Sequence, residues 1–210
     1  MRKKERALKI IECLEHDYPD ALCSLQYPKD YELLFTVRLA AQCTDERVNQ
    51  IAPALFARFP TLESFAAGPV EDVERLVHST GFYRAKARDI VAAARMLIAD
   101  FGGKVPDNME DLLKLPGVGR KTANLILGDV YNAPGAVVVD THCIRITNRM
   151  GLVDVKEPAK IEAELRKILP PEKSNDFCHR LVLHGRAVCT ARRAKCEMCS
   201  CAPYCKQFTP

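Results

Sequence analysis

Apolar residues three and four positions apart recur along almost the whole 210-residue chain, and this periodicity predicts helices rather than strands. Val48, Ile51 and Leu55, for example, would line one face of a helix, and Thr44 precedes them as a suitable N-cap. The only strand-like run is AVVV at 136–139, which is too short and isolated to build a sheet. The sequence therefore predicts an all-α protein.

Glycine and short polar side chains mark where several of these helices should begin and end. The helical segment that follows Phe82 would stop at Gly102 and Gly103. Another helix is expected to start beside Asp107, with Glu110 as its capping-box partner, and to end at Leu115. Residues 1–16 are predicted to form an amphipathic helix whose apolar stripe holds Leu8, Ile11 and Leu14.

Composition excludes two broad classes. No apolar run approaches the roughly 20 residues of a membrane span, and the charged N-terminus lacks the apolar core of a signal peptide. Ten cysteines without a signal peptide favour a metal site in a reduced, cytoplasmic compartment over a secreted disulfide scaffold. The net charge of +4 is compatible with a polyanionic partner.

The stretch LPGVGRKTANLIL at 115–127 indicates a tight turn between two helices. Gly117 and Gly119 allow positive φ angles and place no Cβ in the way of a ligand. Backbone amides at the start of the following helix would then form an anion site, for which phosphate is the usual occupant. An ordinary helix connection is the alternative reading, but Arg120 and Lys121 oppose the helix dipole unless an anion lies nearby.

Lys121 is the candidate nucleophile. Both the helix N-terminus and Arg120 favour its neutral amine, and such an amine can form a Schiff base with an aldehyde carbon. In VVVDTH at 137–142, Asp140 suits an N-cap and could also stabilise developing positive charge. His142 could orient a neighbour or contact phosphate.

Four cysteines near the C-terminus have the spacing C-x6-C-x2-C-x5-C and can converge on one metal centre. The spacing alone leaves zinc and an iron–sulfur cluster open. The loop ARRAK at 191–195 is held between the first two of these cysteines, so its cations could clamp phosphate. The cysteines are Cys189, Cys196, Cys199 and Cys205, with Cys201 as an extra thiol, and the loop cations are Arg192, Arg193 and Lys195.

Taken in order, LPGVGRKTA, VDTHCIR, LHGR and the four-cysteine spacing resemble the endonuclease III family of the helix–hairpin–helix superfamily. LAAQCTDERVN at 39–49 and TGFYRAKA at 80–87 are also similar to that family. The resemblance covers about residues 30–208 and implies two helical lobes with DNA bound between them. One lobe, 23–133, would be a six-helix barrel with the hairpin, and the other, 1–22 with 134–210, would hold a [4Fe-4S] cluster.

The resemblance also implies an activity: a monomeric DNA glycosylase for base excision repair that cleaves the resulting abasic site in duplex DNA. Lys121 would attack the sugar C1′ while Asp140 assists, and the damaged base would be an oxidised pyrimidine. Gln42 would fill the gap left by the flipped base and Phe82 would wedge into the opposite strand, although the familiar wedge residue is leucine. The glycine turn, Arg120 and His142 would contact DNA, and Cys189, Cys196, Cys199 and Cys205 would hold the cluster. In a bacterium the enzyme would be associated with the nucleoid.

Three alternatives remain open. A monofunctional adenine or mismatch glycosylase would share the hairpin and cysteine spacing, but the adenine branch lacks a lysine at the position of Lys121. The oxidised-guanine branch has the lysine but generally not the four cysteines. A non-catalytic helix–hairpin–helix DNA-binding protein would need neither Lys121 nor Asp140.

Overall fold

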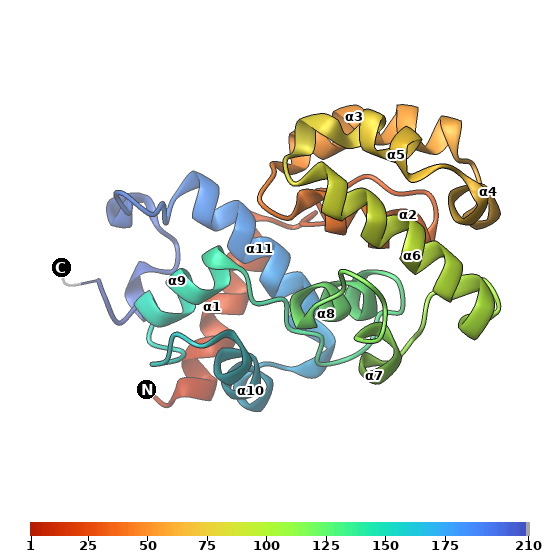
Figure 1. Cartoon of the computed structure of the whole chain (residues 1–210). Coiled ribbons are helices and arrows are strands. Elements are labelled where there is room, and N and C mark those ends of the chain that lie inside the picture. Colours follow the sequence, from red (N-terminus) through yellow and green to blue (C-terminus); the bar gives the residue numbers. More distant parts are fainter. Residues whose placement is uncertain (209–210) are drawn as a thin grey trace. The chain divides into compact units, whose positions relative to one another are not determined.

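The all-α prediction is confirmed. A computed structural model describes residues 1–208, which form α-helices joined by loops and short 3₁₀ turns, with no strand among them (Figure 1). The helices are α1 (Lys3–Asp17), α2 (Asp30–Ala40), α3 (Asp45–Arg58), α4 (Leu62–Ala67), α5 (Val70–Val77), α6 (Tyr83–Phe101), α7 (Met109–Leu112), α8 (Arg120–Asp129), α9 (Thr141–Arg149), α10 (Pro158–Ile168) and α11 (Ser174–Ala187).

The chain divides into two compact units. One consists of residues 24–131 and contains α2 to α8. The other combines residues 1–23 with the chain from residue 132 onward, and contains α1 and α9 to α11. That one unit is a six-helix barrel and the other a cluster lobe stays a prediction.

In the 24–131 unit, α6 is the central element and packs against α2, α4 and α5. Phe65 of α4 is fully buried, with its ring centroid 5.0 Å from Phe35 and 4.9 Å from Phe59. Burying one such ring stabilises the fold by about 1.5–3 kcal/mol. As predicted, α6 ends at Gly102, whose φ of 60° is left-handed, and Thr44 caps α3 by accepting a hydrogen bond from the Arg47 N–H.

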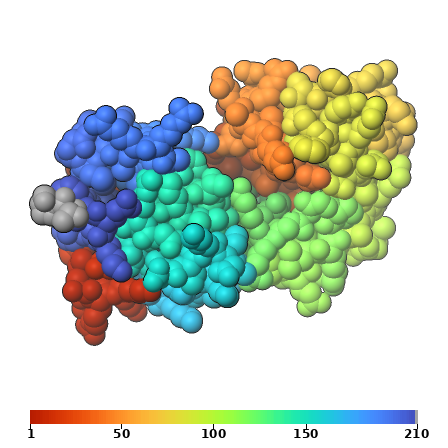
Figure 2. All heavy atoms as spheres, turned by 60° about the vertical axis from the view of Figure 1, so that its left-hand side comes forward, coloured from red at the N-terminus to blue at the C-terminus, as the bar shows by residue number. Residues whose placement is uncertain are grey.

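In the other unit, α11 packs against α1 and α9. Figure 2 shows the N-terminal residues, in red, beside C-terminal residues, in dark blue, so both ends of the chain build this unit. Ile11 and Leu14 are buried as predicted, but Leu8 is 39% exposed. The Leu8 prediction is wrong because the stripe that turns inward is Ala7, Ile10, Ile11 and Leu14, at three- and four-residue steps.

The run AVVV at 136–139 is buried and extended, and it pairs with no other strand in the described chain. The Val138 N–H donates instead to the Cys178 sulfur of α11 at 3.3 Å. Burial of these side chains fixes where Asp140, the next residue, enters α9.

Two predicted features of α7 are wrong. Asn108, not Asp107, is the N-cap, and its side chain accepts a hydrogen bond from the Asp111 N–H at 2.9 Å. The helix ends at Leu112, three residues before Leu115. Residues 113–115 continue as turns, and the Leu115 N–H donates to the Leu112 carbonyl.

Candidate functional site

The predicted glycine turn connects α7 to α8. The Val118 N–H donates to the Leu115 carbonyl at 3.1 Å and closes the turn, while Gly117 has a φ of 74°. Gly119 is the N-cap of α8 with a φ of −104°, so its conformation does not require glycine. A Cβ at Gly119 would have no atom within 4 Å, and no side chain caps this helix. The first turn of α8 thus presents amides that no N-cap side chain covers.

Gly117 is required for a second reason. A Cβ there would lie 2.7 Å from Arg38 Nε and 2.9 Å from Asp89 Oδ2. These two side chains form an ion pair between α2 and α6, with Arg38 Nε donating to Asp89 Oδ2 at 2.7 Å. The turn therefore packs against the Arg38–Asp89 ion pair, a contact that the turn sequence alone did not predict.

The first turn of α8 carries the two predicted cations and no acidic residue. Lys121 is exposed, and the opposite side of the helix buries Ala123, Ile126 and Leu127. Packing of that apolar face holds the helix in place, so Lys121 can reach solvent from a fixed backbone position.

Asp140 is the N-cap of α9, as predicted. Its Oδ1 accepts a hydrogen bond from the Cys143 N–H at 2.7 Å, and the residue is half-buried. Its second carboxylate oxygen is not used by this cap. Lys121 and Asp140 lie in different units of the chain, on the 24–131 side and the 132-onward side respectively.

His142 and Arg145 of the VDTHCIR segment pack against Gly185 of the LHGR segment. A Cβ on Gly185 of α11 would lie 2.3 Å from His142 Nδ1 and 2.9 Å from Arg145 Nη2. Arg145 Nη2 lies 3.2 Å from His142 Nδ1 and donates to the Cys189 carbonyl at 3.0 Å. Glycine therefore lets α9 and α11 approach closely, and His142 has a packing role between these helices.

Gln42 and Phe82 are non-glycine residues in the left-handed region, with φ values of 55° and 47°. Such a conformation costs about 1–3 kcal/mol and persists only where the surroundings impose it. Phe82 is also 69% exposed, which is unusual for a large aromatic side chain. The structure therefore presents both predicted DNA-inserting residues at strained, exposed corners of the same unit.

A buried lysine forms hydrogen bonds with the backbone just before Gln42 and just before Phe82. Lys86 is fully buried, and its Nζ donates to the carbonyls of Leu39 and Thr80, each at 2.8 Å. These carbonyls lie three residues before Gln42 and two before Phe82. Burial lowers the pKa of the Lys86 ammonium. Sequence reasoning missed this residue, although a lysine in register with Ile90 and Leu97 on an apolar helix face was the available signal.

The four predicted cysteine ligands line one pocket, together with Arg149 and His184. No three of their sulfur atoms lie within 4.8 Å of one another in the part of the chain that the structure describes. Four thiolates around a single Zn²⁺ would be about 3.8 Å apart, given Zn–S bonds of about 2.3 Å. The described structure therefore does not hold these thiols at the spacing of a mononuclear zinc site. These cysteines are Cys189, Cys196, Cys199 and Cys205.

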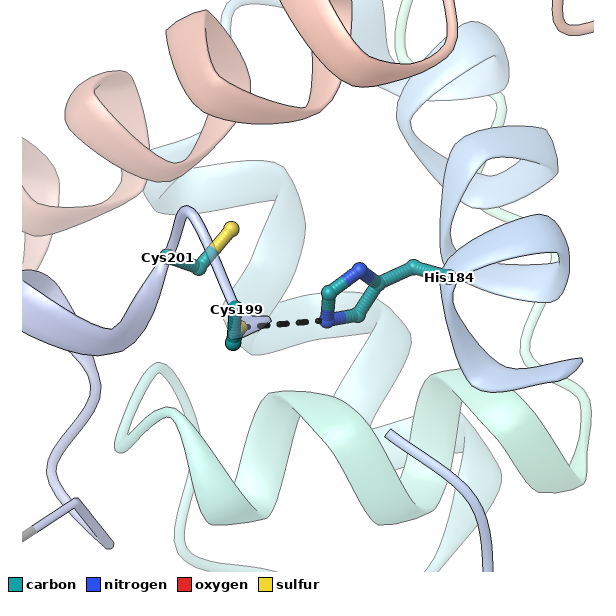
Figure 3. Close-up of side chains that lie close together, drawn as sticks. All are labelled: His184, Cys199 and Cys201. Atoms are coloured by element: carbon teal, nitrogen blue, oxygen red, sulfur yellow. Dashed lines mark hydrogen bonds between the residues drawn. The ribbon is translucent and has the colours of Figure 1, made fainter. Parts of the chain in front are cut away.

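The fifth thiol, Cys201, is fully buried and does not line that pocket. It forms a hydrogen bond with Cys199, and that bond lowers the pKa of Cys199 to about 4 and raises the pKa of Cys201. Figure 3 shows His184 of α11 with its ring pointing at Cys199, at 3.6 Å from Nε2 to the sulfur. The sequence alone indicated no role for His184.

The predicted phosphate clamp is a closed loop. The Thr190 hydroxyl accepts from the Arg193 N–H at 3.2 Å and donates to the Arg193 carbonyl at 2.6 Å. Arg192 and Arg193 are exposed, whereas Lys195 Nζ donates to the Ala187 carbonyl at the end of α11. Two of the three predicted cations thus extend from a fixed loop, and the third also serves the helix end.

Among the described helices, none combines the length and apolar character of a membrane span.

Known proteins resemble this chain over nearly its whole length. The family model described as "HhH-GPD superfamily base excision DNA repair protein" matches residues 37–171. Endonuclease III of Synechocystis is 45% identical over 203 residues, which is 97% of this chain and 93% of that protein. Endonuclease III of Escherichia coli is 35% identical, covering 97% of this chain and 96% of that protein.

Solved structures give the same result. A trapped endonuclease III–DNA covalent intermediate superposes with a TM-score of 0.92 at 36% identity, covering 99% of this chain and 98% of that one. A non-covalent endonuclease III–DNA complex gives the same TM-score and identity, covering 99% and 97%. A thermostable thymine-DNA glycosylase, at 22% identity and a TM-score of 0.86, shares the fold.

Proposed function

The chain belongs to the HhH-GPD superfamily of base excision DNA repair proteins, in the endonuclease III family, and we infer that it is a DNA glycosylase with abasic-site lyase activity. Its substrate is duplex DNA that contains a damaged base, and we propose oxidised pyrimidines as the class it removes. The enzyme would act as a monomer in the cytoplasm, on the nucleoid. The observation that carries this proposal is an exposed lysine, Lys121, in the first turn of a helix whose N-terminus no side chain caps.

Lys121 is proposed to attack C1′ of the damaged nucleotide. The amine nitrogen forms a bond to C1′, and the bond from C1′ to the base breaks with its electron pair leaving on the base. Ring opening then gives a protonated Schiff base, which withdraws electrons and permits β-elimination of the 3′ phosphate. An arginine cannot replace the lysine here, because the guanidinium stays protonated. A solved endonuclease III–DNA covalent intermediate, 36% identical to this chain, supports an enzyme nucleophile.

Asp140 is proposed to assist base removal. Its Oδ1 accepts the Cys143 N–H bond that caps α9, which fixes the carboxylate while leaving its second oxygen outside that bond. A fixed negative charge stabilises the oxocarbenium-like sugar that forms as the base departs. Its alternative role is to take the proton from the Lys121 ammonium, which leaves the neutral amine that attacks C1′.

DNA contacts are proposed at three places. The amides of the Gly117–Gly119 turn, with Arg120 beside them, bind a backbone phosphate. Gln42 and Phe82 occupy the space opened when the base is flipped, because an emptied stack costs a few kcal/mol. Arg192, Arg193 and Lys195, with His142, would contact further phosphates.

The four pocket cysteines are proposed to hold a [4Fe-4S] cluster, whose bonds to their thiolates would tie the C-terminal loop together. None of the catalytic steps above uses it. Purified protein should then be yellow-brown, with about four iron and four sulfide per chain. A folded protein that is colourless and holds no iron after purification from iron-replete cells would refute the cluster.

The activity is tested with a panel of duplex oligonucleotides that contain an abasic site, thymine glycol, uracil or an adenine mispair. A bifunctional endonuclease III should cleave the DNA strand at the abasic site and at thymine glycol without any alkali treatment. A monofunctional adenine or mismatch glycosylase would leave strands intact until alkali is added. A protein that bound every duplex and altered none would be the non-catalytic alternative.

A further inference from the structure

A second group of metal-binding side chains lies beside the cysteine pocket. His184, Cys199 and Cys201 each place a ligand atom within 4.8 Å of the other two (Figure 3). His184 and Cys201 are fully buried, and Cys199 is half-buried. Only Cys199 belongs to the four-cysteine motif, so neither the motif nor the proposed cluster accounts for this arrangement.

The one ligand–ligand distance known in this group matches a single tetrahedral ion. Bonds of about 2.3 Å to sulfur and about 2.0 Å to nitrogen place the two ligand atoms of a tetrahedral Zn²⁺ roughly 3.5 Å apart. His184 Nε2 lies 3.6 Å from the Cys199 sulfur. The ring and the thiol are therefore already spaced as two ligands of one tetrahedral ion.

His184 also has the outer partner that metal-binding histidines use. Its Nδ1 lies 3.5 Å from the Tyr18 hydroxyl, and the two rings pack edge to face with centroids 6.1 Å apart. A ligating imidazole usually engages a second group through its other nitrogen, which fixes its orientation. Tyr18 provides that contact here and leaves Nε2 directed at Cys199.

The segment that carries Cys201 is fixed as well. The Ser200 hydroxyl donates to Asp17 Oδ2 at 2.6 Å, and Cys13 of α1 donates to the Ser200 carbonyl at 3.5 Å. Cys13 is also a near neighbour of Cys201. A fourth sulfur is thus next to the group, although it lies outside the 4.8 Å set.

We propose that His184, Cys199 and Cys201 form a mononuclear site for a thiophilic d¹⁰ cation such as Zn²⁺. Two thiolates and one imidazole match the ligand preference of zinc, and Cys13 or a water molecule completes the tetrahedron. The site itself does not depend on the proposed cluster. One consequence does rest on the proposed cluster. Because Cys199 belongs to both ligand sets, a chain holds either the cluster or this ion. The supply of each metal during folding then decides which of them is bound.

The deciding measurement is zinc K-edge X-ray absorption on the full wild-type chain, purified from iron-limited, zinc-supplemented cells. The expected first shell contains one imidazole and two or three sulfurs. A shell of four sulfurs without imidazole would place zinc on the cluster cysteines and overturn the proposal. Failure to retain zinc after gel filtration would also overturn it.

Paired variants separate the two sites. Cys201→Ser should lower zinc affinity by at least about 100-fold, beyond the 10- to 100-fold typical of outer partners, yet leave the brown chromophore of iron-grown protein intact. Cys196→Ser should do the reverse, losing the chromophore while zinc affinity changes less than about threefold. Cys178→Ser, which removes a buried thiol elsewhere, is the control and should alter neither. If zinc affinity falls with Cys196→Ser rather than with Cys201→Ser, the assignment of the zinc site is wrong. If neither the wild type nor any variant binds iron, only the proposed cluster is refuted.

Discussion

The N-termini of α8 and α9 differ in how their unpaired backbone N–H groups are capped. Both helices begin with backbone amides that lack partners within the helix. In α9 the Asp140 side chain covers one of them by accepting the Cys143 N–H. In α8 the N-cap is Gly119, which has no side chain to do so, and two cations follow it.

This difference indicates what each helix end is for. Asp140 supplies an internal negative charge, which both stabilises α9 and is available for chemistry. The α8 terminus carries Arg120 and Lys121 instead, and helix N-termini of this kind favour an anion from outside the helix. One helix end thus carries its own carboxylate, and the other carries two cations, beside which the proposed function places a DNA phosphate.

The largest effect among these tests is expected at Asp140. Asp140→Asn keeps a capping oxygen but removes the charge, so base excision should fall by about 10²- to 10⁴-fold. Cleavage of a preformed abasic site should fall less, because its base has already left. Single-turnover rates on thymine glycol and abasic duplexes measure the two steps.

Asp140→Ala is the matched control for capping. It removes the charge and the cap together, and should cost about 1 kcal/mol of unfolding free energy that Asp140→Asn does not. Equal loss of excision in the two variants, with loss of stability only in Asp140→Ala, separates chemistry from capping. Full excision activity in Asp140→Asn would confine the residue to its structural role.

Substitutions of the two turn glycines should have smaller effects, but they separate the stability of the turn from its proposed binding of phosphate. Gly117→Ala should reduce the unfolding free energy by about 1–3 kcal/mol, because it strains a left-handed residue and contacts the Arg38–Asp89 pair. Gly119→Ala has open space and an ordinary φ, so stability should change by less than about 0.5 kcal/mol. Its new methyl group should nevertheless weaken DNA binding. Urea unfolding and fluorescence anisotropy check both, and unchanged DNA affinity in Gly119→Ala would argue against a phosphate at this turn.

The smallest effect concerns the loop at 191–195. Removing Arg192 and Arg193 together should reduce the slope of log affinity against log salt by about 1.8, or 0.9 for each lost phosphate contact. Lys195→Ala should change the slope less than either arginine, because Lys195 also donates to the Ala187 carbonyl. An unchanged slope in the double variant would show that the loop does not contact DNA.

The sequence predicted what local patterns determine. The helical class, the Thr44 cap, the Gly102 stop and the Asp140 cap each depend on residues within one turn of a helix, and the structure has all of them. Leu8 and the end of α7 were wrong, since neighbouring elements decide which apolar residues turn inward and how far a short helix continues.

What the sequence could not supply were contacts between distant residues. The Arg38–Asp89 pair beneath Gly117 joins residues 51 apart, and Lys86 reaches a carbonyl 47 residues away. The group formed by His184, Cys199 and Cys201 depends on where α11 places its imidazole. The cysteine spacing predicted a metal centre but carried no information about that histidine.

The central claim is that the amine of Lys121 is the nucleophile, and borohydride trapping tests it most directly. Wild-type protein incubated with abasic duplex and sodium borohydride should form a covalent complex whose adduct maps by mass spectrometry to Lys121. Lys121→Gln should still bind the duplex but give no adduct, while Lys114→Gln, which removes another partly exposed lysine of the same hairpin, should trap like the wild type. Undiminished trapping by Lys121→Gln, or an adduct on any other amine, would contradict the claim and leave the α8 terminus with phosphate binding alone.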